Sequence, residues 1–157
     1  MMPLVNINNI SIRVNQKDII QDVSFQIEKG KVIGLVGPNG GGKSTILKAL
    51  LGLVPLSAGQ IVFEKPLSFG YLPQRPPNSF DLPITVSEAL HIYRATTPKA
   101  KELLARLKLN HIVHSPLYQL SGGELQKVFF IIALAENPDL ILLDEPSASI
   151  DSESDEA

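Results

Sequence analysis

The sequence predicts an α/β fold with an N-terminal layer of antiparallel strands and a block of helices inserted before a last buried strand. Three observations support this. Apolar and polar residues alternate over 4–7 and over 10–14, each as in part of a half-buried strand, and residues 19–20 and 23–27 indicate another strand. The apolar stretch Lys31–Val36 reads as a short buried strand and leads into a glycine-rich loop and a helix. Leu140–Leu143 reads as a fully buried strand and ends in two carboxylates.

The other elements follow from periodicity and from turn residues. Short strands are expected at 61–63 and 68–72, and the proline-containing stretch 73–83 is expected to be a loop or hinge. Helices are expected at 85–93, with Thr85 as N-cap and Glu88 three residues on, at 98–109 and from Ser121 to about Glu136. We therefore expect one domain over 1–157, with a helical subdomain at about 85–136.

The composition indicates a globular chain, argues against a nucleic-acid partner and excludes sites that need cysteine. The 157 residues are 44% hydrophobic and 19% charged, with a net charge of -2. That charge argues against nucleic acid held by bulk electrostatics. The chain has no cysteine, so it can form neither a disulfide framework nor a thiolate metal site. We expect no signal peptide, because Met1-Met2-Pro3-Leu4 leads directly into strand-like sequence.

The glycine-rich loop fits the phosphate-binding pattern G-x-x-x-x-G-K-[ST]. It consists of Gly37, Pro38, Asn39, Gly40, Gly41, Gly42, Lys43, Ser44 and Thr45. Its glycines allow a tight turn that aims successive N–H groups at one anion, and the following helix adds its positive N-terminal end. Lys43 can reach the β- and γ-phosphates, and the Ser44 hydroxyl can bind Mg²⁺. An incidental strand-to-helix turn is the alternative.

Two carboxylates follow the last strand. Asp144 and Glu145 come directly after Leu140–Leu143, and ligands of open α/β sheets gather at the carboxyl ends of strands. Asp144 can hold Mg²⁺ through water, and Glu145 can accept a proton from an attacking water. Phosphoryl transfer needs both a metal-binding carboxylate and a group that orients water. The alternative is an ordinary strand end.

The third predicted helix begins at Leu120-Ser121-Gly122-Gly123-Glu124. Ser121 and Glu124 have the spacing of a capping box. That motif does not explain Gly122 and Gly123, because glycine is a poor helix former. Glycines at this end of a helix allow an anion to approach the backbone closely.

Together these motifs resemble those of the ATP-binding-cassette (ABC) ATPases, in the same order along the chain. The phosphate loop resembles the Walker A motif, and Leu140–Pro146 resembles the Walker B motif. Tyr71–Gln74 resembles the Q-loop, Leu120–Glu124 the family signature, which usually ends in Gln, and Ala148–Asp151 the D-loop. The resemblance covers essentially the whole chain.

The resemblance implies a role for each of these segments. Two copies would pair head to tail and bind two ATP molecules with Mg²⁺, held by Ser44, Gln74 and Asp144. Gln74 would sense the γ-phosphate, and its loop would lie near the contact with the membrane subunit. Glu145 would polarise the hydrolytic water. The γ-phosphate would be bound across the dimer by Ser121, Gly122 and Gly123, and Asp151 would also reach across the dimer.

Two positions depart from the family pattern. The aromatic residue that usually stacks on adenine is best matched by Val14, so ATP binding is expected to be weaker or to use another residue. The family also has a switch histidine on the strand after the D-loop, and the sequence contains no histidine after His114. His91, His111 and His114 all precede the Walker B motif and are expected to be surface or partly buried residues of the helical block.

Within the family, the short strand-turn region before Gln74, the stretch Leu82–Val86 and the Ser-Gly-Gly-Glu signature most resemble those of the ATPase subunits of bacterial zinc and manganese importers. That resemblance implies a membrane permease, an indirect substrate-binding protein, no nucleic acid, and a peripheral position on the cytoplasmic face of the inner membrane. A soluble ABC ATPase with no membrane partner, or a nucleotide-binding fragment that does not hydrolyse ATP, remain as alternatives.

The resemblance also implies an ABC ATPase domain that is incomplete at the C-terminus. In this class the strand after Walker B lies between the Walker A and Walker B strands. Without it, the backbone groups of Lys31–Val36 and Leu140–Leu143 are expected to be buried and unpaired. The 157-residue chain is therefore expected to be aggregation-prone or to shift its strands, and not to hydrolyse ATP at a useful rate.

Overall fold

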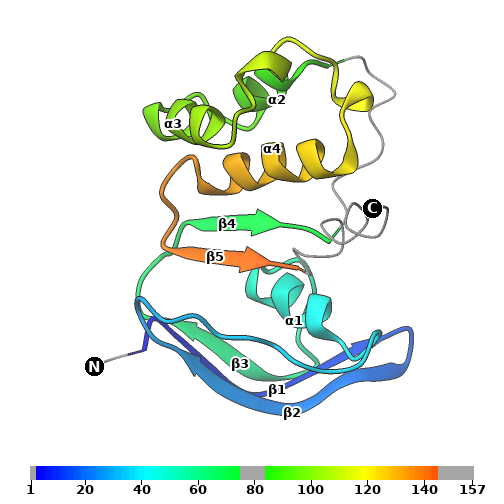
Figure 1. The fold of residues 1–157 in the computed structure, drawn as a ribbon. Helices are drawn as coiled ribbons and strands as arrows, with labels where there is room; N and C mark the ends of the chain where they lie inside the picture. Colours follow the sequence, from blue (N-terminus) through cyan, green and yellow to red (C-terminus); the bar gives the residue numbers. More distant parts are fainter. Residues whose placement is uncertain (1–2, 75–83, 145–157) are drawn as a thin grey trace, which may run out of the picture. The chain divides into compact units, whose positions relative to one another are not determined.

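The computed structural model describes residues 3–74 and 84–144 of the chain. It divides into two compact units, residues 1–67 and 68–157. Figure 1 shows the strands and helices of both.

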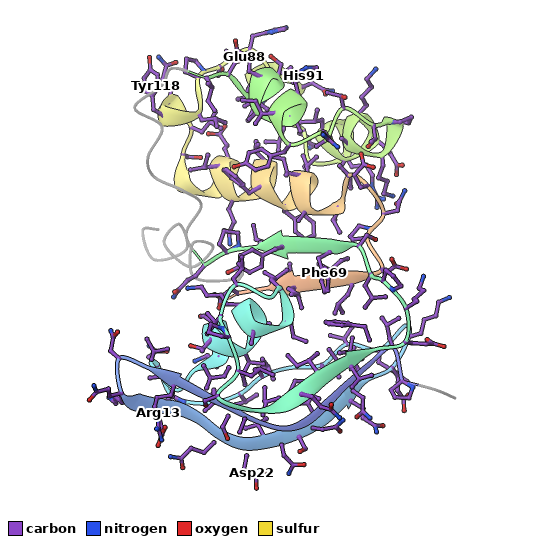
Figure 2. All side chains as sticks on the ribbon, turned by 180° about the vertical axis from the view of Figure 1, so that it is seen from behind. Arg13, Asp22, Phe69, Glu88, His91 and Tyr118 are labelled. Carbon is purple, nitrogen blue, oxygen red and sulfur yellow. The ribbon has the colours of Figure 1, made fainter. Side chains whose placement is uncertain are left out.

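The first unit is built on a three-stranded antiparallel sheet. Its strands are β1 (Val5–Val14), β2 (Lys17–Ile27) and β3 (Ala58–Phe63), in the order β2-β1-β3. The predicted antiparallel layer is therefore confirmed. Side chains on the outer face of this sheet, such as those of Arg13 and Asp22, point away from the helix α1 (Lys43–Leu50) of the same unit (Figure 2).

A bulge explains why β1 is one strand although its sequence alternates in two separate runs. Ile7 and Ile10 are both buried, although residues three apart in a regular strand face opposite sides. The pairing of β1 with β2 shifts between them, and Asn9 there has a φ of 47°. Because the bulge adds one residue, the apolar side chains from Ile10 onward face the same buried side of the sheet as those up to Ile7.

The predicted strand Lys31–Val36 is wrong in this structure. These residues join no ladder within the described part of the chain, and Val32 and Val36 are 100% and 98% exposed. A strand needs a hydrogen-bonded neighbour, and apolar sequence alone does not supply one. The expectation that the backbone here is buried and unpaired is also wrong for this segment, because it is exposed.

The second unit contains a short parallel sheet. Its strands, β4 (Phe69–Leu72) and β5 (Leu140–Leu143), are paired in register from Phe69↔Leu140 to Leu72↔Leu143. Their starting ends are joined by Asp139, whose carboxylate accepts hydrogen bonds from the Ser68 N–H (3.0 Å) and hydroxyl (2.9 Å). In return, the Ser68 hydroxyl oxygen accepts a hydrogen bond from the Asp139 N–H (3.0 Å).

β5 is at the predicted position but is not fully buried. Only Leu142 is buried, whereas Ile141 and Leu143 are exposed. Among the described residues β5 has β4 as its one neighbour. The prediction assumed a central strand covered on both faces, and a strand with one free edge and one covered face does not meet that condition.

Between residues 84 and 144 the second unit also contains three helices and two 3₁₀ turns. They are α2 (Val86–Ile92), α3 (Pro98–Arg106), η1 (Asn110–Ile112), η2 (Leu117–Gln119) and α4 (Gly122–Leu134). Thr85 caps α2 in a capping box with Glu88, as predicted. The buried residues Val86, Leu104, Val128 and Ile131 belong to one apolar core. Within the described ranges, no helix has the length and apolar character needed to cross a membrane.

Gly70 sets how closely α4 approaches β4. A Cβ at this position would lie 2.1 Å from the Ala133 carbonyl oxygen and 2.9 Å from Cγ of Pro138. α4 covers β4 in this unit (Figure 1), so the glycine allows the helix backbone to rest on the strand. The sequence gives no sign of this requirement, because Ala133 lies 63 residues away.

We expect Gly70→Ala to destabilise the second unit by about 3 kcal/mol, the upper end of typical overpacking costs, because the obstacle is backbone. Thermal or urea unfolding measures the loss. Gly122→Ala is the matched control, since a Cβ there meets nothing within 4 Å. Equal stability of the Gly70 variant and the wild type would contradict the close packing of α4 on β4.

Candidate functional site

The glycine-rich loop is held in a conformation that requires glycine at two positions. Gly40 and Gly42 have φ angles of 78° and 85°, in the left-handed region. Gly42 is also the N-cap of α1 (Lys43–Leu50), and a Cβ on it would lie 2.5 Å from Cδ1 of Ile20 on β2. The loop therefore turns directly into a helix packed against the sheet of its own unit.

Lys43 places its charge over this loop. Its ammonium donates hydrogen bonds to the carbonyl oxygens of Gly37 (3.1 Å) and Pro38 (3.0 Å). The Ile46 N–H donates a hydrogen bond to the Gly42 carbonyl at 3.0 Å, so the hydrogen bonds of α1 begin where the loop ends. Buried side chains fix the helix: Ile46, Leu47, Ala49 and Leu50. An ammonium and the N-terminus of an anchored helix thus meet at one loop, an arrangement that attracts anions.

The segment Leu120–Glu124 forms the start of α4. Ser121 is its N-cap, and the predicted capping box with Glu124 is confirmed. The Ser121 hydroxyl oxygen accepts a hydrogen bond from Glu124 N–H (3.3 Å), and Glu124 Oε2 accepts one from Ser121 N–H (2.9 Å). Neither Gly122 nor Gly123 has a positive φ, and a Cβ on either would meet nothing within 4 Å. The described structure therefore gives no packing reason for these glycines.

Gln74 and Asp144 lie at the same edge of the parallel sheet. Leu72 pairs with Leu143, so both residues follow the carboxyl ends of neighbouring strands. Asp144 is buried, and its N–H donates a hydrogen bond to the Leu72 carbonyl at 2.9 Å. Partial burial of the Tyr71 hydroxyl, and secondarily the Asp144 charge, raise the pKa of Tyr71. The Tyr71 phenol therefore stays neutral beside this carboxylate.

Two predicted site residues lie outside the described residues, namely Glu145 and Asp151. Val14, at the end of β1, is exposed. His91, His111 and His114 are exposed on the helical block. In the described part of the chain, no three His, Cys, Asp or Glu side chains gather in a way that could hold a metal ion.

The structure reveals one side chain near the predicted sites that sequence reasoning missed. Nε2 of His111, on η1, lies 3.8 Å from Oε1 of Glu124. The two residues are thirteen apart and on different elements, so no spacing rule predicts their contact. A separate hollow of about 320 Å³ lies along α2 and is lined by Ile84, Ser87, Glu88, His91 and Ile92. Figure 2 shows Glu88 and His91 on the outer side of that helix.

Sequence comparison places these features among known proteins. The family described as "ABC transporter" matches residues 20–148. The chain is 41% identical over 150 residues to the zinc import ATP-binding protein ZnuC 1 of Hahella chejuensis, covering 95% of this chain and 58% of that protein. It is 39% identical over 151 residues to the zinc import ATP-binding protein ZnuC of Pasteurella multocida, covering 96% and 57%. The chain thus spans less than two thirds of the length of these relatives.

Solved structures agree. An ATP-binding subunit of an ABC transporter superposes with a TM-score of 0.82 at 26% identity, over 93% of this chain and 68% of that one. An ATP-binding cassette of an ABC transporter superposes with a TM-score of 0.78 at 27% identity, over 94% and 71%. The predicted phosphate-loop ATPase fold is therefore confirmed. Since the family match includes the glycine-rich loop, the Leu120–Glu124 segment and the last strand, the chain belongs to the ABC transporter family.

Proposed function

We propose that this protein is the ATP-binding and ATP-hydrolysing subunit of an ABC transporter that energises import of a metal ion, zinc or manganese, through a membrane permease. The observation that carries the ATP part is the Lys43 ammonium held over a glycine loop at the N-terminus of α1. The metal is inferred from relatives named as zinc import ATP-binding proteins.

The loop is proposed to hold the phosphates of ATP. The residues involved are Gly37, Pro38, Asn39, Gly40, Gly41, Gly42, Lys43, Ser44 and Thr45. The Lys43 ammonium can exchange its two carbonyl acceptors for phosphate oxygens, which form stronger, charge-assisted hydrogen bonds. The N-terminal end of α1 adds its partial positive charge at the same loop.

Mg²⁺ is proposed to bind through Ser44, Gln74 and Asp144. A hydroxyl, an amide oxygen and a carboxylate are the oxygen donors that this hard cation prefers, so the residue types fit the ion. Asp144 is buried next to the edge where β4 and β5 end, so its position is fixed by the sheet. When bound, Mg²⁺ offsets the charge of the phosphates.

A second copy of the chain is proposed to complete the site. Ser121, Gly122 and Gly123 would contact the γ-phosphate bound by the partner copy, and Asp151 would reach across the same interface. The open space around Gly122 and Gly123 supports this, because backbone without side chains allows an anion close approach. Gln74 would respond to the γ-phosphate, and Glu145 would orient and deprotonate the attacking water.

The permease partner is tested by cell fractionation. A transporter subunit should sediment with inner membranes when the permease is present, on the cytoplasmic side, and remain in the supernatant without it. The substrate-binding protein is expected to act only indirectly. Adding it to membrane vesicles that contain the permease and this subunit should therefore stimulate ATP turnover. Equal distribution with and without the permease would favour a soluble ABC ATPase.

Lys43→Ala tests nucleotide binding. We expect the ATP dissociation constant to rise roughly ten- to hundredfold, since charge-assisted hydrogen bonds contribute about 1.5–3 kcal/mol. Calorimetric titration in the full-length protein measures the change. Lys48→Ala, on the same helix but exposed in its last turn, is the matched control and should bind ATP as the wild type does. If the Lys43 variant binds ATP as tightly as the wild type does, the loop does not hold the phosphates of ATP.

Val14→Tyr tests how adenine is held. We expect ATP to bind about two- to tenfold more tightly, because ring stacking contributes about 0.5–1.5 kcal/mol. Val62→Tyr on β3 is a suitable control, since Val14 and Val62 are 41% and 46% exposed. A fluorescent ATP analogue reports both affinities. If the two variants bind equally, the base does not lie against position 14.

A further inference from the structure

Glu124 carries a charge that its structural role does not require. As the third residue of α4 it closes the capping box with Ser121, and glutamine serves equally well at that position. A carboxylate here instead adds a negative charge next to Gly122 and Gly123, the glycines proposed to receive a phosphate. That charge would oppose an incoming anion unless another group offsets it.

The two oxygens of Glu124 have different partners. Oε2 accepts hydrogen bonds from the Ser121 N–H (2.9 Å) and hydroxyl (2.8 Å). Oε1 faces Nε2 of His111 at 3.8 Å. The carboxylate therefore links the start of α4 to η1, an element that precedes it in the chain.

His111 is held in place by its neighbours rather than by its own side chain. Leu109 and Ile112 on either side are both buried in the helical core, whereas the His111 side chain is 67% exposed. The backbone of η1 is thus anchored, and the imidazole stays in contact with solvent.

Two basic side chains lie near the Glu124 carboxylate in the described structure. Hydrogen bonds from Ser121 are the main reason that the pKa of Glu124 lies below its usual range, and the nearby charges of His111, from η1, and Lys127, from α4 itself, lower it further. Glu124 is therefore anionic at neutral pH. Histidine is the side-chain type that changes charge between about pH 5 and 8.

We propose that His111 is a positioning residue of the Leu120–Glu124 segment: its protonated ring offsets the Glu124 carboxylate beside Gly122 and Gly123, so that ATP is engaged less tightly as His111 loses its proton. This inference rests on the proposed role of the segment in binding phosphate. His111 does not touch the phosphate; it acts through Glu124.

The expected effect is modest and is confined to binding. Exposed ion pairs contribute less than about 1 kcal/mol, so the KM for ATP should rise about two- to fourfold between pH 6 and pH 8.5. The interaction of His111 with Glu124 should affect the binding of ATP equally in the ground state and in the transition state. The pH dependence of kcat should therefore be the same in all variants.

Steady-state ATP turnover of the full-length protein over this pH range provides the test. Wild type and the control His114→Gln, on the same connection, should show the rise in KM. His111→Gln should have the high-pH KM throughout, and Glu124→Gln should have a low KM throughout. If His111→Gln keeps the wild-type KM curve, the inference is overturned.

A readout without turnover separates this inference from the proposed function. The carbon signal of the Glu124 carboxyl, followed by NMR as pH is lowered, reports the pKa of Glu124. His111→Gln should raise this pKa, but by less than Ser121→Ala does, because the Ser121 hydrogen bonds are the larger cause. If the pKa of Glu124 is unchanged in His111→Gln, His111 does not act on Glu124, whatever the rate of ATP turnover. A raised pKa in a protein that never turns over ATP overturns both the ATPase assignment and the effect on KM.

Discussion

Glu145→Gln should lower the rate of ATP hydrolysis about 100-fold or more while leaving ATP binding intact. The amide keeps the shape of the carboxylate and can still contact a water molecule, but it cannot accept the proton of that water. Loss of a general base costs about 10²–10⁴-fold in rate. Because two copies with uncleaved ATP would stay joined, a dimer should accumulate in the presence of ATP and Mg²⁺.

Phosphate release and size-exclusion chromatography with ATP measure these two effects in the full-length protein. Glu136→Gln is the control, because Glu136 is an exposed carboxylate just beyond α4 that has no proposed role. It should turn over ATP as the wild type does and elute in the same way. Hydrolysis by the Glu145 variant at the rate of the control would show that another group activates the water.

A polypeptide of residues 1–157, purified alone, should show no sustained ATP turnover and no sharp unfolding transition. Val32 and Val36 are almost fully exposed, and Ile141 and Leu143 of β5 are exposed as well. Burying one such side chain stabilises a fold by about 1.5–3 kcal/mol, which is large against a total stability of about 5–15 kcal/mol. Exposed apolar side chains favour aggregation, and so does the edge of β5 that has no strand neighbour among the described residues. The switch histidine expected from the family resemblance is absent from this sequence after His114.

Phosphate release, light scattering and calorimetric melting of the 157-residue polypeptide measure these properties. The full-length ZnuC 1 of Hahella chejuensis, studied in parallel, gives the comparison, because it shares 41% identity over 150 residues. A single sharp transition together with sustained turnover would show that the residues present suffice for a stable, active enzyme.

The sequence by itself determined the local structure of the proposed site. The pattern from Gly37 to Thr45 predicts a loop running into a helix, and the spacing of Ser121 and Glu124 predicts a capping box; the structure has α1 and the capped α4 at these positions. Both motifs depend on hydrogen bonds and backbone angles within a few residues. Such interactions are encoded locally, so they can be read without knowledge of the fold.

Tertiary structure alone decided which apolar segments become strands. Lys31–Val36 and Leu140–Leu143 are similarly apolar, but only the second has a hydrogen-bonded neighbour, β4, in the described structure. Tertiary structure also decided the contacts between residues far apart in the sequence. The backbone of Ala133 packs closely against Gly70, and His111 faces Glu124. A residue's own sequence neighbours specify its conformation, whereas its burial and its charge partners depend on which distant segment packs against it.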